Sequence, residues 1–214
     1  VLSERPGMSA ADVKALRDKG VAERMRRTGA IVREAAAGDG AAMEALASHR
    51  SDMVRSWAAY ALVAGPGLDL EERLARSRRF AADGHMAVRE SAWDCFRPFL
   101  AQELSRGLRL LRPWVRDGDP NVRRCAVEAT RPRGVWTQHL VPLKEDPAPG
   151  LPLLEPVRSD ESRYVQRAVG NWLNDAAKTR PDWVRDLCRR WSRESRTKET
   201  EWTVKHASRS LPGL

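Results

Sequence analysis

The sequence predicts an all-α fold: a right-handed α-solenoid of HEAT-like helical repeats with a concave basic groove. Three observations predict it, namely a recurring phrase, a composition that favours helix and a surplus of positive charge. The phrase combines an acidic or polar turn, a valine, a basic or amide residue and an Ala-rich helix. Its recurrence indicates stacked helical pairs, whose equivalent residues share one continuous surface.

The valines of this phrase set the length of the repeat. Successive valines are separated by 34, 34, 43 and 39 residues, and about 40 residues is the length of a HEAT repeat. We expect each valine to face the core, and the next residue, about 100° further round the helix, to reach a groove edge. The five valines are Val54, Val88, Val122, Val165 and Val204.

The composition favours helix and a polyanionic partner. Ala, Leu and Arg dominate the 214 residues, and β-branched residues are sparse. The net charge is +9, from 38 basic and 29 acidic residues. A basic, arginine-rich domain most often binds nucleic acid. A GC-rich genome that replaces lysine by arginine explains the ratio of the two residues, but it does not explain the surplus of positive charge.

The sequence shows no pattern typical of a disulfide framework, a metal site, a membrane span or a signal peptide. The three cysteines are odd in number and widely spaced, so they predict neither a disulfide framework nor a zinc site. The four histidines show no metal-ligand spacing, and we find no membrane-spanning run or signal peptide. We therefore expect no metal, no organic cofactor, no membrane association, no obligate protein partner and a cytoplasmic location.

Glycine and proline separate the apolar, alanine-rich runs, which therefore predict a series of helices. Ser9 is a candidate N-cap of the first helix, Gly38 ends the second, and the Gly-Pro-Gly sequence from Gly65 ends the fourth. Apolar residues at helical spacing then mark pairs of outer and inner helices. Over the first half of the chain the predicted helices are 10–19, 21–37, 41–49, 51–63, 69–82 and 85–100.

The second half continues the pattern with one irregular segment. Pro120 is a good start signal because proline is tolerated in the first turn of a helix, and the RPRGVW sequence from Arg131 ends that helix early. Segment 137–160 holds five prolines, so it predicts short helices and explains the 43-residue step. The remaining predicted helices are 101–117, 120–130, 161–178, 181–195 and 199–211. We expect one domain over 1–214, with clear repeats from about 45 to 211.

The residue after each repeat valine is usually basic. These residues predict a ladder of cations that contacts DNA along the groove. In an alternative that stays open, each arginine pairs with the aspartate of the preceding turn, Asp52, Asp83 or Asp119, and so stabilises the repeats. The ladder consists of Arg55, Arg89, Arg123, Arg167 and Lys205, with Gln166 as its irregular member.

The EATRPRGVW sequence carries the residues best suited to chemistry. Glu128 lies six residues after its repeat valine, off the core stripe, and a helix break brings Trp136 back toward it. An acid beside an indole, with Arg131 and Arg133 next to both, suits a transition state of carbocation character. In the alternative interpretation, the glutamate caps a helix and the tryptophan belongs to the core.

Polar side chains also share one face of the helix predicted over 161–178. Asn171, Asn174, Asp175 and Lys178 lie at spacings of three, four and seven residues, so they form a stripe in which Lys178 can contact a phosphate. Hydrogen bonds between repeats are the alternative for the two asparagines. On the last helix, His206 and Arg209, with Trp202 and Lys205, are candidates for contacts to the DNA backbone.

Several segments resemble a known family: the DNA alkylation repair glycosylases built from HEAT-like repeats, the AlkC/AlkD superfamily, closer to the AlkC branch. The resemblance covers about 45–211, and its most specific phrases are NWLNDAAK and EATRPRGVW. It implies hydrolysis of the N-glycosidic bond of cationic alkylated bases in duplex DNA: 3-methyladenine, 7-methylguanine and 3-methylcytosine. It also implies that the base is not flipped into a pocket, as most base-excision enzymes do. The other segments that carry the resemblance are AWDCFRPFL, NVRRCAVEATRPRGVW, YVQRAVGNWLNDAAKTRPDWVRDLCRRW and EWTVKHASRSL.

The resemblance assigns the candidate catalytic residues. Glu128 matches the acid of the family, and Trp136 matches its indole. One repeat earlier, the acid of the family's AlkC branch aligns with Trp93, and Asp94 is the neighbouring carboxylate, so the sequence leaves open whether one or two acids act. Glu90 is a further candidate. Two other functions stay possible: a non-enzymatic HEAT-repeat protein that binds DNA structure, and a scaffold for protein partners.

Overall fold

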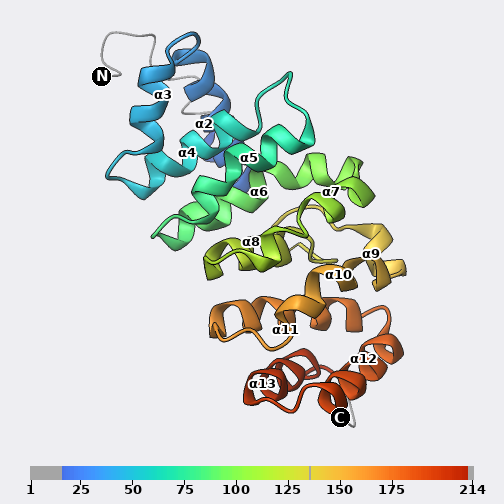
Figure 1. The fold of residues 1–214 in the computed structure, drawn as a ribbon. Coiled ribbons are helices and arrows are strands. Elements are labelled where there is room, and N and C mark those ends of the chain that lie inside the picture. The colour runs from blue at the N-terminus through green and yellow to red at the C-terminus, as the bar shows by residue number, and fades with distance from the viewer. Residues whose placement is uncertain (1–15, 135, 212–214) are drawn as a thin grey trace. The chain divides into compact units, whose positions relative to one another are not determined.

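The computed structural model describes residues 16–134 and 136–211. All regular secondary structure in these ranges is helical, which confirms the predicted all-α class (Figure 1). The predicted helix over 10–19 lies largely outside the described residues. The α-helices are α2 (Val21–Ala35), α3 (Gly40–Ala47), α4 (Asp52–Val63), α5 (Leu70–Ala81), α6 (Met86–Gln102), α7 (Leu104–Leu110), α8 (Pro120–Ala129), α9 (Val141–Glu145), α10 (Leu151–Leu154), α11 (Arg163–Ala177), α12 (Pro181–Glu194) and α13 (Lys198–Ala207).

The predicted helices are confirmed to within a few residues, with one exception. We predicted one outer helix over 101–117, but α7 ends at Leu110 and a separate 3₁₀ turn follows at Trp114–Arg116. Pro113, which has no N–H to donate, lies between them and prevents continuation of the α-helix. The proline-rich segment forms the predicted short helices: α9, α10 and the 3₁₀ turns Ala148–Gly150 and Glu155–Val157.

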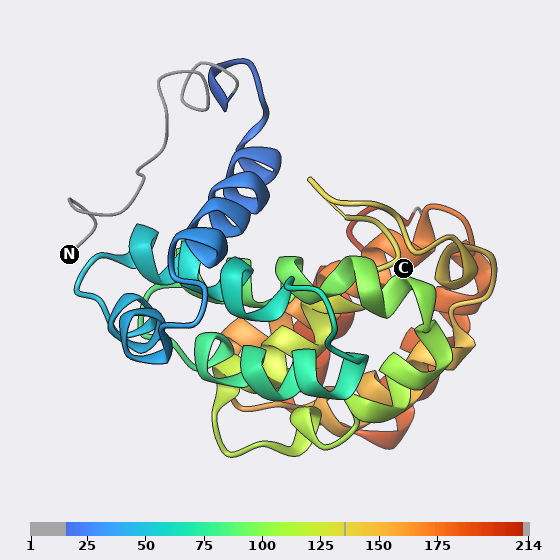
Figure 2. The same cartoon turned by 90° about the horizontal axis from the view of Figure 1, so that it is seen from above.

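The chain divides into two compact units, 1–96 and 97–214, with the boundary inside α6. In the first unit α2 packs against α4 (Figures 1 and 2). Gly29 permits this packing, because a Cβ at that position would lie 2.3 Å from the Cβ of Tyr60. The buried Arg73 of α5 donates to the carbonyl oxygens of Val63 and Gly65, at 2.5 and 2.8 Å, and so completes the C-terminal end of α4.

In the second unit α11 packs against both α8 and α13 (Figure 1). Trp172 of α11 is fully buried, and its indole N–H donates to the carbonyl oxygen of Thr130 at 2.9 Å. Gly150 lies against the Trp172 ring, where an added Cβ would be 2.4 Å from Cζ2. Trp172 is therefore a core residue, and its ring ties the segment after α8 to α11.

The repeat valines are buried in the middle of the series and less so at its ends. Val88, Val122 and Val165 are fully buried, as predicted. The prediction was wrong for Val54 and Val204, which are half-buried. In α13 the fully buried residues are Thr200, Thr203 and Ala207 instead, so this helix turns a different face to the core.

Two searches of the described part of the chain give negative results. None of its helices has the length and apolarity needed to cross a membrane. Within 16–134 and 136–211, no three His, Cys, Asp or Glu side chains gather closely enough to hold a metal ion.

Candidate nucleic-acid interface and carboxylate cluster

Glu128 lies near the end of α8 and is only 4% exposed. Its carboxylate binds two guanidinium groups, that of Arg124 at 3.4 Å and that of Arg131 at 3.1 Å. The helix ends at Ala129, so the chain turns directly after the glutamate and Arg131 can fold back onto it. The sequence placed this acid off the core stripe, and the structure shows it buried among cations instead of apolar side chains.

Arg131 also joins Glu128 to a second buried carboxylate, Asp175 of α11. Its Nε–H donates to Asp175 Oδ2 at 2.8 Å, and Lys178 Nζ lies 3.6 Å from the other carboxylate oxygen. Burial acts to lower the pKa of Arg131, but the charge of Glu128 and the hydrogen bond to Asp175 outweigh burial and raise it. We call Arg124, Glu128, Arg131, Asp175 and Lys178 the carboxylate cluster.

The segment that carries Arg131 is held by a buried arginine that the sequence analysis did not single out for a role. Arg97 is fully buried, and its guanidinium donates to the carbonyl oxygens of Ala129 at 2.6 Å, Arg131 at 2.7 Å and Gln138 at 3.0 Å. It therefore satisfies carbonyls left open where α8 ends. The Arg-Pro-Phe phrase was the only signal in the sequence, and it did not reveal these contacts across more than thirty residues.

Trp136 is 52% exposed, so it is not the core residue of the alternative interpretation. It follows Gly134, where an added Cβ would lie 2.4 Å from Cγ2 of Thr137, so the turn has no room for a larger residue. Arg133, in the same turn, is half-buried. The predicted approach of the indole to Glu128 stays a prediction.

The first unit holds its own buried carboxylate, Asp94 of α6. The Tyr60 hydroxyl donates to it at 2.6 Å, and the Arg26 guanidinium lies 3.3 Å away. Burial and the adjacent Asp94 both raise the pKa of Tyr60 above its usual range. Trp93 is also buried, and its indole N–H donates to Glu90 at 3.1 Å. Both predicted catalytic residues of this unit, Trp93 and Asp94, therefore bind other side chains of the protein.

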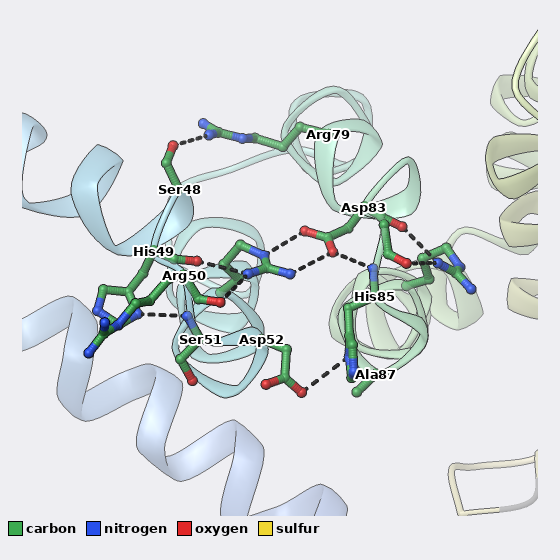
Figure 3. Close-up of polar contacts among 12 residues, drawn as sticks. Ser48, His49, Arg50, Ser51, Asp52, Arg79, Asp83, His85 and Ala87 are labelled. Atoms are coloured by element: carbon green, nitrogen blue, oxygen red, sulfur yellow. Dashed lines mark hydrogen bonds and ion pairs between the residues drawn. The ribbon is translucent and has the colours of Figure 1, made fainter.

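The arginines that follow the repeat valines bind protein groups. Arg55 forms a two-pronged ion pair with Asp83, at 2.7 and 2.9 Å, and donates to the carbonyl oxygens of His49 and Arg50. Figure 3 labels these three partners. Arg89 donates to the carbonyl oxygens of Asp83 and Gly84. Each guanidinium therefore closes the turn that precedes its own helix.

Arg123 repeats this arrangement in the second unit. It pairs with Asp160 at 2.7 and 2.9 Å and donates to the carbonyl oxygens of Asp117 and Gly118. Arg55 and Arg123 do form ion pairs, but the predicted partner was wrong: each binds the aspartate of the following turn, Asp83 or Asp160, and not that of the preceding one. This arrangement joins successive repeats, and a contact of these arginines with DNA stays a prediction.

Helices α11 and α13 bring together the remaining predicted residues. His206 Nε2 lies 3.0 Å from Asn171 Oδ1, which also accepts a hydrogen bond from Arg209 at 3.0 Å. Asn174 donates to the carbonyl oxygen of Ala207 at 3.3 Å. The interpretation of the two asparagines as hydrogen bonds between repeats is confirmed. Arg167 of α11 and Lys205 of α13 are exposed, and so are Lys178 and Arg209, which follow the ends of these helices.

The environment of His206 predicts a loss of stability in acid. Burial first, and then the positive charges of Arg209 and Arg167, lower the pKa of His206 from its ordinary 6.5. The unfolded chain therefore takes up the proton at higher pH than the folded chain does, and stability falls as protons are added. We expect the free energy of unfolding, measured in urea, to decrease from about pH 7.5 to about pH 5.5.

Two variants test this pH dependence. His206→Gln removes the group and is expected to flatten the dependence. His139→Gln is the comparison: burial and Lys144 also lower the pKa of His139, but this side chain is exposed, so its removal should flatten the dependence less. Equal pH dependence in the parent chain and in His206→Gln would contradict the assignment.

Comparisons with known proteins place this chain among DNA repair proteins. Residues 41–211 match the family model described as DNA alkylation repair enzyme. The chain is 40% identical over 115 residues to the uncharacterized protein YhaZ of Bacillus subtilis (strain 168), a match that covers 54% of this chain and 32% of that protein. The chain thus spans about a third of the length of this relative.

Two solved structures are similar over most of the chain. The alkylpurine DNA glycosylase AlkC of Pseudomonas fluorescens, bound to DNA containing an abasic site analog, shares 26% identity at a TM-score of 0.52. That match covers 89% of this chain and 62% of AlkC. AlkD2 of Streptococcus mutans shares 22% identity at a TM-score of 0.69, covering 92% of this chain and 95% of AlkD2, and it supports the fold alone. Both matches agree with the predicted helical-repeat fold.

Proposed function

Because the chain belongs to the DNA alkylation repair enzyme family, we propose that it is a DNA glycosylase acting on cationic alkylated bases in duplex DNA. The bases are of the 3-methyladenine, 7-methylguanine and 3-methylcytosine class, and they are released without being flipped into a protein pocket. One observation carries this proposal: two buried carboxylates, Glu128 and Asp175, joined by Arg131 in a unit rich in cations.

The chemistry that such carboxylates can support is hydrolysis through a sugar cation. The bond between C1′ and the base nitrogen breaks, and its electron pair neutralises the positive charge of the leaving base. A water oxygen then bonds to C1′, and its proton passes to a carboxylate such as Glu128 or Asp175. No acid is needed to protonate the leaving group, because the alkylated base leaves as a neutral molecule.

A carboxylate next to the sugar cation would stabilise it enough to increase the rate of base release substantially. A carboxylate about 4 Å from a unit positive charge stabilises it by about 4 kcal/mol at an effective dielectric constant of about 20. That corresponds to a rate increase on the order of 10³-fold. Glu128 is buried, so solvent screens its charge less than it would at the surface.

The cations of the cluster suit the phosphates of DNA. Arg124, Arg131 and Lys178 outnumber the two carboxylates, so the cluster can accept a further anion. A phosphate that draws Arg131 toward itself leaves Glu128 with more of its charge for the sugar. Because binding of this kind releases counterions, affinity should fall steeply with salt. The other residues proposed to contact DNA are Arg133, Arg167, Lys205, His206 and Arg209.

Two residues of the first unit are also proposed to act in catalysis: Asp94 as a second carboxylate, and Trp93 as an aromatic side chain beside it. Asp94 is buried and bound by Tyr60 and Arg26, as Glu128 is bound by its arginines. Comparing base release by Asp94→Asn and by Glu128→Gln will show whether one or two acids act.

A second candidate function is non-enzymatic binding to damaged DNA. It is favoured by the pairing of Glu128 with two arginines, which neutralise its charge when no DNA is bound. This candidate keeps the cationic surface and predicts salt-sensitive DNA binding with no release of base.

The two functions are tested by comparing release of a cationic base and of a neutral base from duplex DNA. We expect the chain to release 7-methylguanine from duplex DNA, and not hypoxanthine, a neutral base that needs protonation to leave. Both oligonucleotides should be bound with similar affinity. Equal release of the two bases would contradict the proposal, because it would require a general acid that the mechanism does not use.

A further inference from the structure

The face of α11 that carries Asp175 continues as a cationic stripe away from the carboxylate cluster. Asn171, Arg167 and Arg163 precede Asp175 at intervals of four residues, so they form a row on successive turns that winds by about 40° per step. The row runs from the buried Asp175 to the exposed Arg167 and Arg163. The twelve residues from Arg163 to Asp175 correspond to about 18 Å along the helix axis. The stripe is therefore long enough to follow several nucleotides of one DNA strand.

Arg163, at the start of this stripe, is held by an aromatic stack. Its guanidinium lies 4.1 Å from the centre of the Trp202 ring, and Trp202 is stacked on His206 with 4.8 Å between ring centres and 12° between planes. His206 is fixed in turn by Asn171. Gly170 makes room for the imidazole, since an added Cβ would lie 2.6 Å from His206 Cδ2.

The stack fixes Arg163 while leaving it exposed. Its cation–π contact uses one face of the guanidinium and leaves the N–H groups at the edge open to an anion. A cation in the first turn of a helix also opposes the helix dipole, so the position of Arg163 in α11 is electrostatically unfavourable for the helix itself. A surface arginine without the stack would lose side-chain entropy on binding, and a fixed one loses less.

The charges of this surface are not neutralised by protein groups. Among residues 16–134 and 136–211, no carboxylate forms an ion pair with Arg163, Arg167 or Lys205. The arginines of α12 differ, because Arg185 pairs with Asp182 at 2.6 Å and Arg189 with Asp186 at 3.5 Å. The surface also lies next to the carboxylate cluster, because Asn171, which binds His206 and Arg209, precedes Asp175 by about one turn of α11.

We infer that Arg163, Arg167 and Lys205, the backbone patch, bind the sugar-phosphate backbone next to the lesion, and that Trp202 is a positioning residue for Arg163. The inference rests on the proposed function, because it extends the DNA contact of that site along α11 and α13. The patch reads no sequence, since phosphates are the same at every base pair.

The test measures binding of the full-length chain to duplex DNA that holds an abasic site analog, at several salt concentrations. The variants are Arg163→Gln and Trp202→Leu, with Arg189→Gln as the control for loss of one positive charge. For Arg163→Gln we expect roughly tenfold weaker binding and a salt slope smaller by about 0.9, the value of one phosphate contact. Trp202→Leu keeps the charge and should still lower the slope, and Trp202→Phe should restore it.

The outcomes separate this inference from the proposed function. If Arg163→Gln binds as Arg189→Gln does, with an unchanged slope, the backbone patch is wrong, whatever the chain does to alkylated bases. A Trp202→Leu chain that is destabilised but keeps the parental slope would overturn the positioning role. If the parent chain releases no base and the slope still falls, the patch stands and the glycosylase proposal fails.

Discussion

A Glu128→Gln chain is expected to release 7-methylguanine from duplex DNA on the order of 10²- to 10³-fold more slowly than the parent chain under single-turnover conditions. The substitution keeps the size of the side chain and removes the negative charge that we propose stabilises the developing sugar cation. DNA affinity should be kept or increase slightly, because Arg124 and Arg131 lose a carboxylate partner and become available to phosphates.

Two further variants make this result specific. Asp175→Asn tests the second carboxylate of the cluster and should also slow base release. Glu155→Gln is the matched control, because Glu155 is paired with Arg158 and Arg190 in the same unit but outside the cluster. Parental rates for Glu128→Gln, with the protein folded, would contradict the assigned role of Glu128.

An Arg97→Met chain is expected to lose about 3 kcal/mol or more in its free energy of unfolding, measured in urea. Methionine fills part of the same volume but cannot donate to the carbonyl oxygens of Ala129, Arg131 and Gln138. Those oxygens would lose their donor in a buried site. The segment that carries Arg131 would also lose its anchor, so base release should fall with stability.

The control for this variant is Arg106→Met on α7, where the guanidinium is exposed and paired with Glu103 at 3.0 Å. Exposed pairs of this kind contribute at most about 1 kcal/mol. A loss for Arg97→Met no greater than that for Arg106→Met would contradict the anchoring role.

Local signals in the sequence predicted the helices and singled out four members of the carboxylate cluster, but not the ion pairs that join them. These four are Glu128, Arg131, Asp175 and Lys178. Breaks such as the Gly-Pro-Gly sequence after α4 and the proline at the start of α8 mark helix ends that depend on neighbouring residues. Glu128 could be selected because it lies off the apolar stripe of its own helix. The split between α7 and the following 3₁₀ turn was missed, although Pro113 gave a signal for it.

The way in which the side chains of the site come together depends on contacts between distant parts of the chain. Arg131 and Asp175 are 44 residues apart, and no spacing rule connects an inter-helix loop to the last turn of a later helix. Arg97 is similar, because its acceptors are carbonyl oxygens that have no side-chain signature. The repeat arginines could be found from the sequence, because their residue type and their period are evident. Their partners could not, because an arginine such as Arg55 can bind either a protein carboxylate or a DNA phosphate.

Single-turnover release of 3-methyladenine and 7-methylguanine from methylated duplex DNA by the unmodified chain tests the central claim most directly. We predict free base and an equal amount of abasic sites, formed much faster than by spontaneous loss, with DNA binding that weakens as salt increases. Salt-sensitive binding with no release above the spontaneous rate would contradict the glycosylase assignment and favour a protein that only binds damaged DNA.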